Sequence, residues 1–267
     1  MPVLHNYYVF WDIKKNFKVE KEFLERDASG ISAKEKETLK MILYQRNPRG
    51  KFFAERNRIQ LTIDQVTCLI GERYLNDNVI NYLMNIFEKE GNLLLGRNAC
   101  LAVDSLLLNC SKSTISQSIR RCCCGKDVTQ LEIIVIPTHL QHASHWGLAK
   151  IEVKTKAVFF DDGLHMRHPK ELEMVVRIII NTLHILSSSD LFEIKAWEPL
   201  RFEPFGMPDQ PSTGEGSSSC GVATLMAARN FFHGEPLTWT YEETSYFRRK
   251  FLLELIQDGQ QRSACLN

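Results

Sequence analysis

The segment from residue 131 to residue 161 constrains the fold more than any other part of the sequence. Leu131–Pro137 (LEIIVIP) is a continuous apolar run rich in β-branched side chains, which is typical of a buried strand. His145–Val153 (HWGLAKIEV) alternates in polarity and predicts a second strand. After a polar turn at Lys154–Lys156, Ala157–Asp161 (AVFFD) predicts a third strand that forms a hairpin with the second. A strand buried on both faces needs helices to cover its sheet.

Helical patterns lie on both sides of this segment. Asn76–Glu90 carries a broad apolar stripe, has Asn76 or Asp77 as its cap, and is expected to end at Gly91. The remaining elements follow from periodicity and turn residues. They are helices at Thr62–Leu69, Pro169–Leu186, Glu242–Asp258 and directly after Cys220, an edge strand at Phe192–Ala196, and a loop over Phe205–Ser219. This order predicts the α+β class.

Composition excludes several classes of protein. The chain has 267 residues, of which 44% are hydrophobic, and this is enough for a sizeable core. A net charge of +1 gives no reason to expect nucleic acid or a membrane surface as a partner. No apolar run approaches the roughly 18 residues needed to span a bilayer, and the first residues lack the order of a secretory signal. We therefore expect an intracellular protein.

Cysteine usage and domain organisation are also informative. The eight cysteines are not needed as disulfides in a chain of this size. The run Cys122–Cys124 lacks the paired spacing of a structural zinc site, so we expect reduced thiols and no metal. Residues 1–59 are mixed and charged and are interpreted as an N-terminal extension, with a capped helix over Ser32–Gln45. Residues 60–267 are expected to form one domain.

Cys220 lies where a nucleophile would need to be. It follows the small, polar run Gly216–Ser219 and precedes Gly221 and an apolar stretch with helical spacing. The first turn of a helix offers free backbone N–H groups and a partial positive charge, and both favour thiolate over thiol. A small core cysteine that starts a buried helix would have the same local pattern, however, because a Cys-Gly pair is a weak motif.

A nucleophilic cysteine needs a base, and His145 is the best-placed histidine. It begins a predicted strand directly after a polar turn, where its ring can face a cleft. The neighbouring strand of the hairpin ends at Asp161 and Asp162. In an antiparallel pair the start of one strand lies beside the end of the other, so a carboxylate is within reach of the imidazole. Together these residues favour catalysis over a purely structural interpretation.

Several stretches, in the same order, resemble the ubiquitin-like-protein-specific cysteine proteases, which are the sentrin (SUMO) protease family with adenain-like folds. They are LTIDQVTCLIGERYLNDNVINYLMNIF from Leu61, VIPTHLQHASHWGLAKIEV from Val135, VFFDDGLH from Val158, MPDQPSTGEGSSSCGVATLMAARNFF from Met207 and TSYFRRKFLLELI from Thr244. Each motif alone is weak, whereas their order over most of the chain is specific. The resemblance implies a papain-like, adenain-like α+β fold, with a central mixed β-sheet flanked by helices, and a catalytic domain over residues 60–267.

The resemblance also implies roles for individual residues. His145 would be the general base, and Cys220 would attack the scissile carbonyl. Asp162 is preferred as the third member, because Asp162-Gly163-Leu164 resembles the family's Asp-Ser-Leu and because strand alternation supports it. Alignment of the paired aromatic residues would favour Asp161 instead. Gln210 would help to hold the oxyanion.

Three other residues are expected to meet the substrate. Trp146 resembles the tryptophan that roofs a narrow tunnel, which admits an extended Gly-Gly tail and excludes side chains. Tyr74 stands where the family usually has a second tunnel tryptophan, and Asp77 stands where an acid often touches the modifier. The chain departs from the family at Tyr74, in a longer loop before Cys220, and at Ser219, which replaces a common aspartate.

The resemblance therefore predicts a cysteine isopeptidase that cleaves after the C-terminal Gly-Gly of a ubiquitin-like modifier. SUMO and its conjugates are the expected partners. No cofactor or metal is required, and we expect a monomer of the nucleus or cytoplasm that binds neither nucleic acid nor membrane. Two alternatives remain open. One is the same chemistry on ubiquitin, NEDD8 or a viral or transposon polyprotein, and the other is a non-catalytic module that binds a modifier.

Overall fold

The structure is a computed structural model, and it describes residues 32–35, 37, 52–56, 59–212 and 216–265. The helix expected over Ser32–Gln45 lies for the most part outside these residues. Within it, residues 33–35 and 37 are helical.

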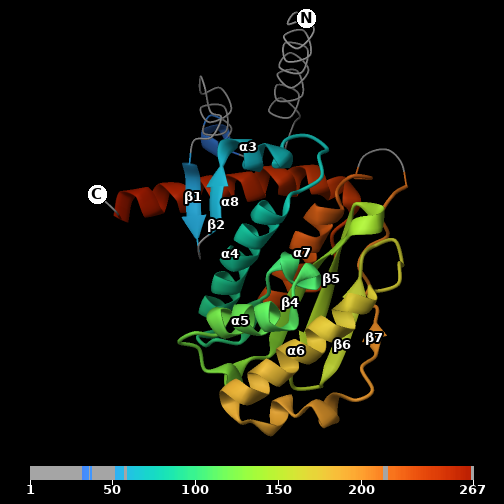
Figure 1. Ribbon diagram of the computed structural model, residues 1–267. Coiled ribbons are helices and arrows are strands. Elements are labelled where there is room, and N and C mark those ends of the chain that lie inside the picture. The colour runs from blue at the N-terminus through green and yellow to red at the C-terminus, as the bar shows by residue number, and fades with distance from the viewer. Residues whose placement is uncertain (1–31, 36, 38–51, 57–58, 213–215, 266–267) are drawn as a thin grey trace, which may run out of the picture.

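A five-stranded mixed sheet forms the centre of the protein (Figure 1). In spatial order its strands are β3 (Cys100–Ala102), β4 (Ile133–Leu140), β5 (His145–Glu152), β6 (Ala157–Asp161) and β7 (Phe202–Glu203). The three middle strands are antiparallel neighbours, and β3 and β7 join the two edges in parallel. The hairpin expected from the sequence is formed by β5 and β6, which pair from Glu152 and Ala157 to Leu148 and Asp161.

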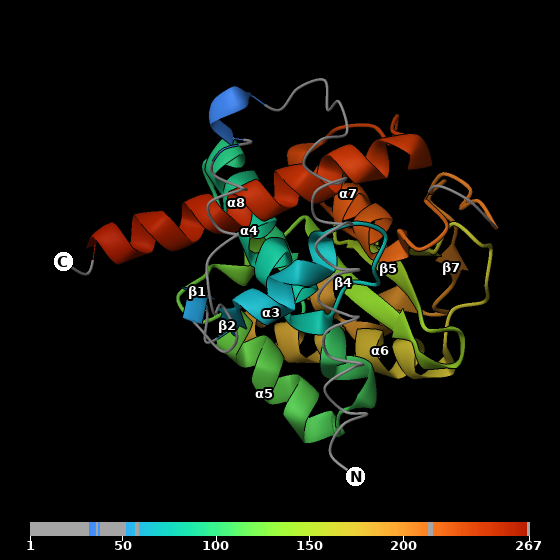
Figure 2. The same cartoon turned by 90° about the horizontal axis from the view of Figure 1, so that it is seen from above.

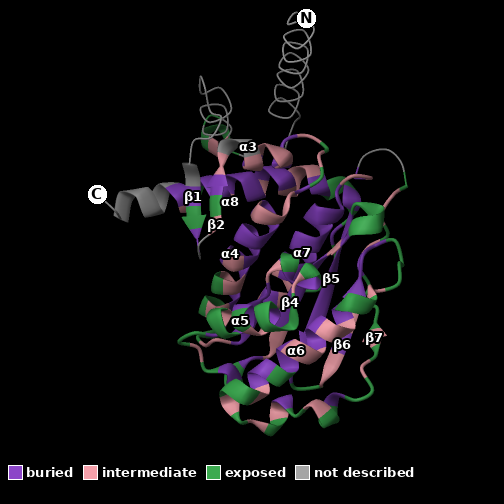
Figure 3. Ribbon diagram, in the orientation of Figure 1, coloured by how far each residue is buried: buried purple, intermediate pink, exposed green. Residues whose placement is uncertain are grey.

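Alternate residues of the middle strands enter two separate cores, because successive side chains of a strand point to opposite faces. Ile134 and Ile136 of β4 join one core, and Val135 joins the other. Helices supply the rest of both cores, which are purple in Figure 3. One face is covered by α5 (Lys112–Cys122) and α6 (Lys170–Ser187), and the other by α4 (Asp77–Leu95), α7 (Cys220–His233) and α8 (Thr244–Cys265). The α+β class, with a central mixed sheet between helices, is confirmed.

Helix α7 is the internal helix of the fold. Every residue from Cys220 to Ala228 is buried. A helix that is apolar on all sides belongs inside a protein, and α7 packs against both α4 and β5. Its N-terminus is therefore held firmly against the sheet.

Helix α4 begins as expected and ends later than expected. Asn76 is its N-cap and accepts a hydrogen bond from the backbone N–H of Val79 at 3.0 Å. The helix does not stop at Gly91 but continues to Leu95, before Gly96 in a left-handed conformation (φ 65°). A glycine is required at this position of the helix because α7 passes close by. A Cβ on Gly91 would be 2.7 Å from the carbonyl oxygen of Phe232.

We expect Gly91→Ala to lower the free energy of unfolding by about 1–3 kcal/mol, because the added methyl group would force α4 and α7 apart. Urea denaturation would measure the change. The matched control is Lys89→Ala on the exposed side of the same helix, which should stay within about 0.5 kcal/mol of the wild type. A Gly91→Ala protein as stable as the control would contradict this account of the helix crossing.

The edge strand expected at Phe192–Ala196 is wrong. This segment forms two short 3-10 helices, η5 (Asp190–Phe192) and η6 (Ile194–Trp197). Phe192 and Trp197 both enter the core, and the indole N–H of Trp197 donates to the carbonyl of Leu191 at 2.9 Å. Two tight turns, and not an extended strand, bring both of these side chains into the core. The edge position is taken by β7 further along.

A second, two-stranded sheet was not predicted; it is formed by β1 (Phe52–Arg56) and β2 (Ile59–Thr62). Thr62 therefore ends a strand, and the helix expected from this residue starts one position later as α3 (Ile63–Val66), followed by η1 (Thr67–Leu69). The hairpin lies at the same end of the molecule as α8 (Figure 1), and the view from above shows the two elements side by side (Figure 2). Arg56 of β1 forms an ion pair with Asp258 of α8, so the hairpin spans the expected domain boundary at residue 60.

No helix in the described ranges is both long enough and apolar enough to cross a membrane. These residues also contain no group of three or more His, Cys, Asp or Glu side chains that could hold a metal ion. In the cysteine run Cys122–Cys124, neighbouring residues differ in exposure: Cys123 is buried and Cys124 is exposed.

Candidate active site

Cys220 is the first residue of α7, and its side chain is 1% exposed. The helix end beside it carries unpaired N–H groups, and no acidic residue lies in the first turn of α7. Gly221 is needed here for space, since a Cβ would lie 3.0 Å from the Cβ of Leu75 and 3.2 Å from the ring of Trp146. The thiol therefore lies at the positive end of a rigid, buried helix.

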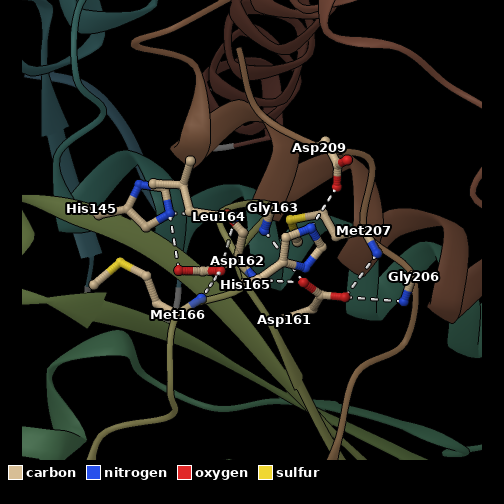
Figure 4. A network of polar contacts seen from close by, with 10 residues as sticks. All are labelled: His145, Asp161, Asp162, Gly163, Leu164, His165, Met166, Gly206, Met207 and Asp209. Atoms are coloured by element: carbon tan, nitrogen blue, oxygen red, sulfur yellow. Dashed lines mark hydrogen bonds and ion pairs between the residues drawn. The ribbon is translucent and has the colours of Figure 1, made fainter. Parts of the chain in front are cut away.

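His145 and Asp162 face one another across the ends of β5 and β6 (Figure 4). The Nε2 atom of His145 is 2.9 Å from the backbone carbonyl oxygen of Asp162 and 3.4 Å from its carboxylate Oδ2. The other carboxylate oxygen, Oδ1, accepts the backbone N–H groups of Leu164 at 3.0 Å and Met166 at 3.1 Å. Both contacts fix the orientation of the carboxylate, which is fully buried.

The side chain of Cys220 also interacts with the imidazole and acts to raise its pKa. Because Nε2 faces Asp162, Nδ1 is the ring nitrogen left for the sulfur. Burial would lower the pKa of His145, but the interactions with Asp162 and Cys220 outweigh it and raise the pKa to about 10. Burial likewise opposes ionisation of Asp162, and the hydrogen bonds from His145 and the loop N–H groups still lower its pKa. The raised pKa of His145 and the lowered pKa of Asp162 favour an imidazolium beside a carboxylate.

Asp161 points away from His145 and has a different set of contacts. Its Oδ2 accepts the backbone N–H groups of Gly206 and Met207, each at 3.0 Å, and its Oδ1 accepts the N–H of Asp162 at 2.9 Å (Figure 4). The carboxylate therefore joins the end of β6 to a neighbouring loop. Of the two adjacent acids, Asp162 contacts the imidazole of His145, whereas the carboxylate of Asp161 accepts backbone N–H groups.

Gln210 lies between the two loops that border the site. Its backbone N–H donates to the carbonyl of Gly163 at 2.7 Å, directly after Asp162. Its side-chain Nε2 donates to the carbonyl of Ser217, in the loop that leads to Cys220, whereas its buried Oε1 has no hydrogen-bond partner among the described residues. In this arrangement one N–H of the amide is engaged with Ser217, and the second N–H remains for another acceptor.

The other two residues expected to meet the substrate, Tyr74 and Asp77, flank the segment that contacts Trp146. This tryptophan is 4% exposed, donates its indole N–H to the carbonyl of Leu75 at 3.0 Å, and packs beside Gly221. Tyr74 directly precedes Leu75 and is 60% exposed, so its ring is free to contact a partner. Asp77 is the first residue of α4 and is half-buried.

Sequence reasoning missed His139 and Tyr241. The ring of His139 lies 4.6 Å from that of Trp146, its cross-strand partner in β4 and β5. Strand pairing, once the register was known, would have identified it. Tyr241 is 4% exposed, and its hydroxyl has no hydrogen-bond partner in the part of the chain that the structure describes. Burial raises the pKa of Tyr241, and the charges of Cys220 and Asp162 act in the same direction. No sequence motif identifies Tyr241 as a residue of the site.

Comparisons with known proteins agree with this geometry. Residues 73–262 match the Ulp1 protease family, C-terminal catalytic domain. The sequence is 24% identical over 209 residues to Sentrin-specific protease 2 of Homo sapiens, which covers 78% of this chain and 34% of that protein. It is 25% identical over 246 residues to Ubiquitin-like-specific protease 1A of Arabidopsis thaliana, which covers 88% of this chain and 47% of that protein. The chain thus spans less than half the length of these relatives.

Solved structures show the same fold. The C-terminal Ulp1 protease domain in complex with Smt3, the yeast ortholog of SUMO, superposes with a TM-score of 0.68 at 20% identity, covering 87% of this chain and 98% of that one. The Ulp1-like SUMO protease catalytic domain of Chaetomium thermophilum gives a TM-score of 0.66 at 17% identity, covering 88% and 93%. The papain-like, adenain-like fold expected from the sequence is confirmed.

Proposed function

Since the chain belongs to the Ulp1 protease family, we propose that it is a cysteine isopeptidase that cleaves after the C-terminal Gly-Gly of a ubiquitin-like modifier, namely SUMO. The observation that carries the proposal is the His145 imidazole, which contacts Asp162 at the ends of β5 and β6 and whose pKa is raised by Asp162 and Cys220. A thiolate–imidazolium pair at a helix N-terminus is the state that a cysteine nucleophile requires.

In the proposed reaction the Cys220 thiolate attacks the carbonyl carbon of the last glycine, and its electron pair forms the C–S bond. The C=O electrons move to oxygen, giving a tetrahedral oxyanion. When this collapses, the bond to the lysine nitrogen breaks and His145 donates its proton to the leaving amine. Neutral His145 then takes a proton from water, and the resulting hydroxide adds to the thioester carbonyl. The C–S bond breaks, which releases the Cys220 thiolate and the modifier's carboxylic acid, and the acid gives its proton to the solvent. The histidine ends the cycle protonated, as it began.

The oxyanion would be held by backbone N–H groups at the start of α7 and by Gln210. The amide of Gln210 has one N–H engaged with Ser217, which orients the group while leaving the other N–H for the substrate. A fixed donor is worth more than a mobile one, because no reorganisation is needed as the charge develops.

The proposed substrate rests on the region around Trp146. The buried ring beside Gly221 suits a narrow tunnel that only glycine residues can pass. The relatives and solved neighbours are named for sentrin and SUMO, and this supports SUMO and its conjugates as the partners. Tyr74 and Asp77 would contact the body of the modifier. We further propose that residues 60–267, with β1 attached, form the catalytic domain of a monomer in the nucleus or cytoplasm.

A panel of modifier probes tests this proposal. SUMO, ubiquitin and NEDD8, each ending in Gly-Gly and a cysteine-reactive electrophile, are incubated with the protein, and the rate of adduct formation is measured. We expect the SUMO probe to react at least about tenfold faster than the others. A SUMO probe with a Gly-Ala terminus is the matched control and should be excluded. Preference for ubiquitin or NEDD8 would refute SUMO as substrate, and failure of all probes would support a non-catalytic module or a polyprotein protease.

A further inference from the structure

Arg248 of α8 is a buried cation without a carboxylate partner. It is 1% exposed, and none of the ion pairs among the described residues includes it. Its guanidinium donates to the carbonyl of Cys68 at 3.1 Å, to the carbonyl of Ser218 at 3.1 Å and to the hydroxyl of Ser219 at 3.3 Å. The last two residues directly precede Cys220. The arginine therefore holds the loop that leads into the candidate nucleophile.

A cation taken out of water is costly unless a negative charge compensates it. Burial lowers the pKa of Arg248 to about 10, while the charges of Cys68, Cys220 and Glu72 act in the opposite direction. These are the ionisable groups that the guanidinium meets from η1, α7 and the loop before α4. Cys68 does not compensate the charge, because burial raises the pKa of its thiol. Glu72 is exposed to solvent, so its effect is screened. Of these three groups, Cys220 is therefore the one that can compensate the positive charge of Arg248.

We propose that Arg248 is a positioning residue for Cys220, which fixes the Ser218–Ser219 loop and stabilises the thiolate with its buried charge. Ser219 is part of this arrangement. Its hydroxyl accepts from the guanidinium, and a carboxylate in its place would pair with Arg248 and neutralise its charge. The inference rests on the proposed function, because it concerns the same nucleophile.

The groups around the thiol set the conditions for this effect. His145 from β5 and Arg248 from α8 are the cations whose charges interact with Cys220. Tyr241 from η7 (Tyr241–Glu243) also interacts with it and stays neutral, because burial raises its pKa. Asp162 already interacts with His145. Two cations therefore interact with Cys220, and loss of Arg248 should change the pH dependence of its reactivity.

The test is the pH dependence of Cys220 alkylation by iodoacetamide, followed by mass spectrometry of the Cys220 peptide. Arg248→Gln removes the charge and keeps hydrogen-bond donors, whereas Arg248→Lys keeps the charge and loses the planar fork. We expect Arg248→Gln to raise the alkylation midpoint by about one pH unit, with a roughly tenfold lower rate below it. Arg248→Lys should keep a midpoint close to that of the wild type. A purely structural role would shift both variants equally, and that result would overturn the proposal.

A second pair of variants leaves the arginine in place, in case its replacement prevents folding. Ser219→Asp adds a carboxylate beside the guanidinium, and Ser219→Asn adds a neutral group of the same shape. We expect the midpoint to rise in Ser219→Asp and not in Ser219→Asn; an unchanged Ser219→Asp would refute the electrostatic role. Alkylation needs no modifier, so the two proposals can fail separately. A protein that ignores every modifier probe but shows these shifts would refute only the proposed function.

Discussion

Cys220→Ala is expected to abolish turnover, with a loss of about 10⁴-fold or more, while the fold and the affinity for the modifier are kept. The reaction proceeds through a covalent bond to sulfur, and no other group on α7 could form it. The side chain is buried at the start of a helix that packs on all sides, so a smaller residue leaves the helix in place. Cleavage of a SUMO conjugate measures activity, and isothermal titration calorimetry measures affinity.

The matched control is Cys124→Ala. Cys124 is exposed and lies just beyond α5, so its loss removes a thiol without touching the site. Its turnover and melting temperature should equal those of the wild type. A Cys220→Ala protein that still cleaves at the normal rate would exclude this thiol as the nucleophile. One that neither cleaves nor binds, yet melts normally, would show that Cys220 also shapes the binding surface.

Local patterns predicted the parts of the fold that carry the site. The β5–β6 hairpin follows from alternation and a short polar turn, and its pairing brings His145 beside Asp162. The start of α7 follows from an apolar helix preceded by small polar residues. These features depend on residues close in sequence, and so the sequence alone was sufficient for them.

The elements that the sequence did not predict depend on distant partners. The β1–β2 hairpin is held by Arg56 through Asp258, at the opposite end of the chain. Arg248 is one of several charges in the helix expected over Glu242–Asp258, and its guanidinium is buried where it meets Cys68 and the Ser218–Ser219 loop. Gly91 was predicted to end the helix, because nothing close to it in the sequence indicates that Phe232 packs against it. Tertiary contacts overrode local preference at each of these positions.

Asp162→Asn is expected to reduce kcat/KM by roughly 10²–10⁴-fold, because the amide no longer stabilises the imidazolium of His145. The pH profile should change with it. In the wild type the pKa of His145 is about 10, so its protonated form persists until the pH rises through that value. Without the carboxylate, burial lowers this pKa, and the alkaline limb of activity should move to lower pH. A rate measured from pH 5 to 10 on the SUMO conjugate would show the shift.

Asp161→Asn is the matched comparison, since Asp161 is the last residue of β6 and Asp162 follows it directly. Its carboxylate accepts the N–H groups of Gly206 and Met207, and an amide can replace only part of this set. We expect a loss of about 1–3 kcal/mol in the free energy of unfolding. The kcat and the alkaline limb of the folded enzyme should stay near those of the wild type. The reverse outcome, in which Asp161→Asn loses kcat and Asp162→Asn only stability, would assign the third catalytic role to Asp161. The two substitutions are at adjacent positions, so any difference between the variants must come from the different contacts of the two carboxylates.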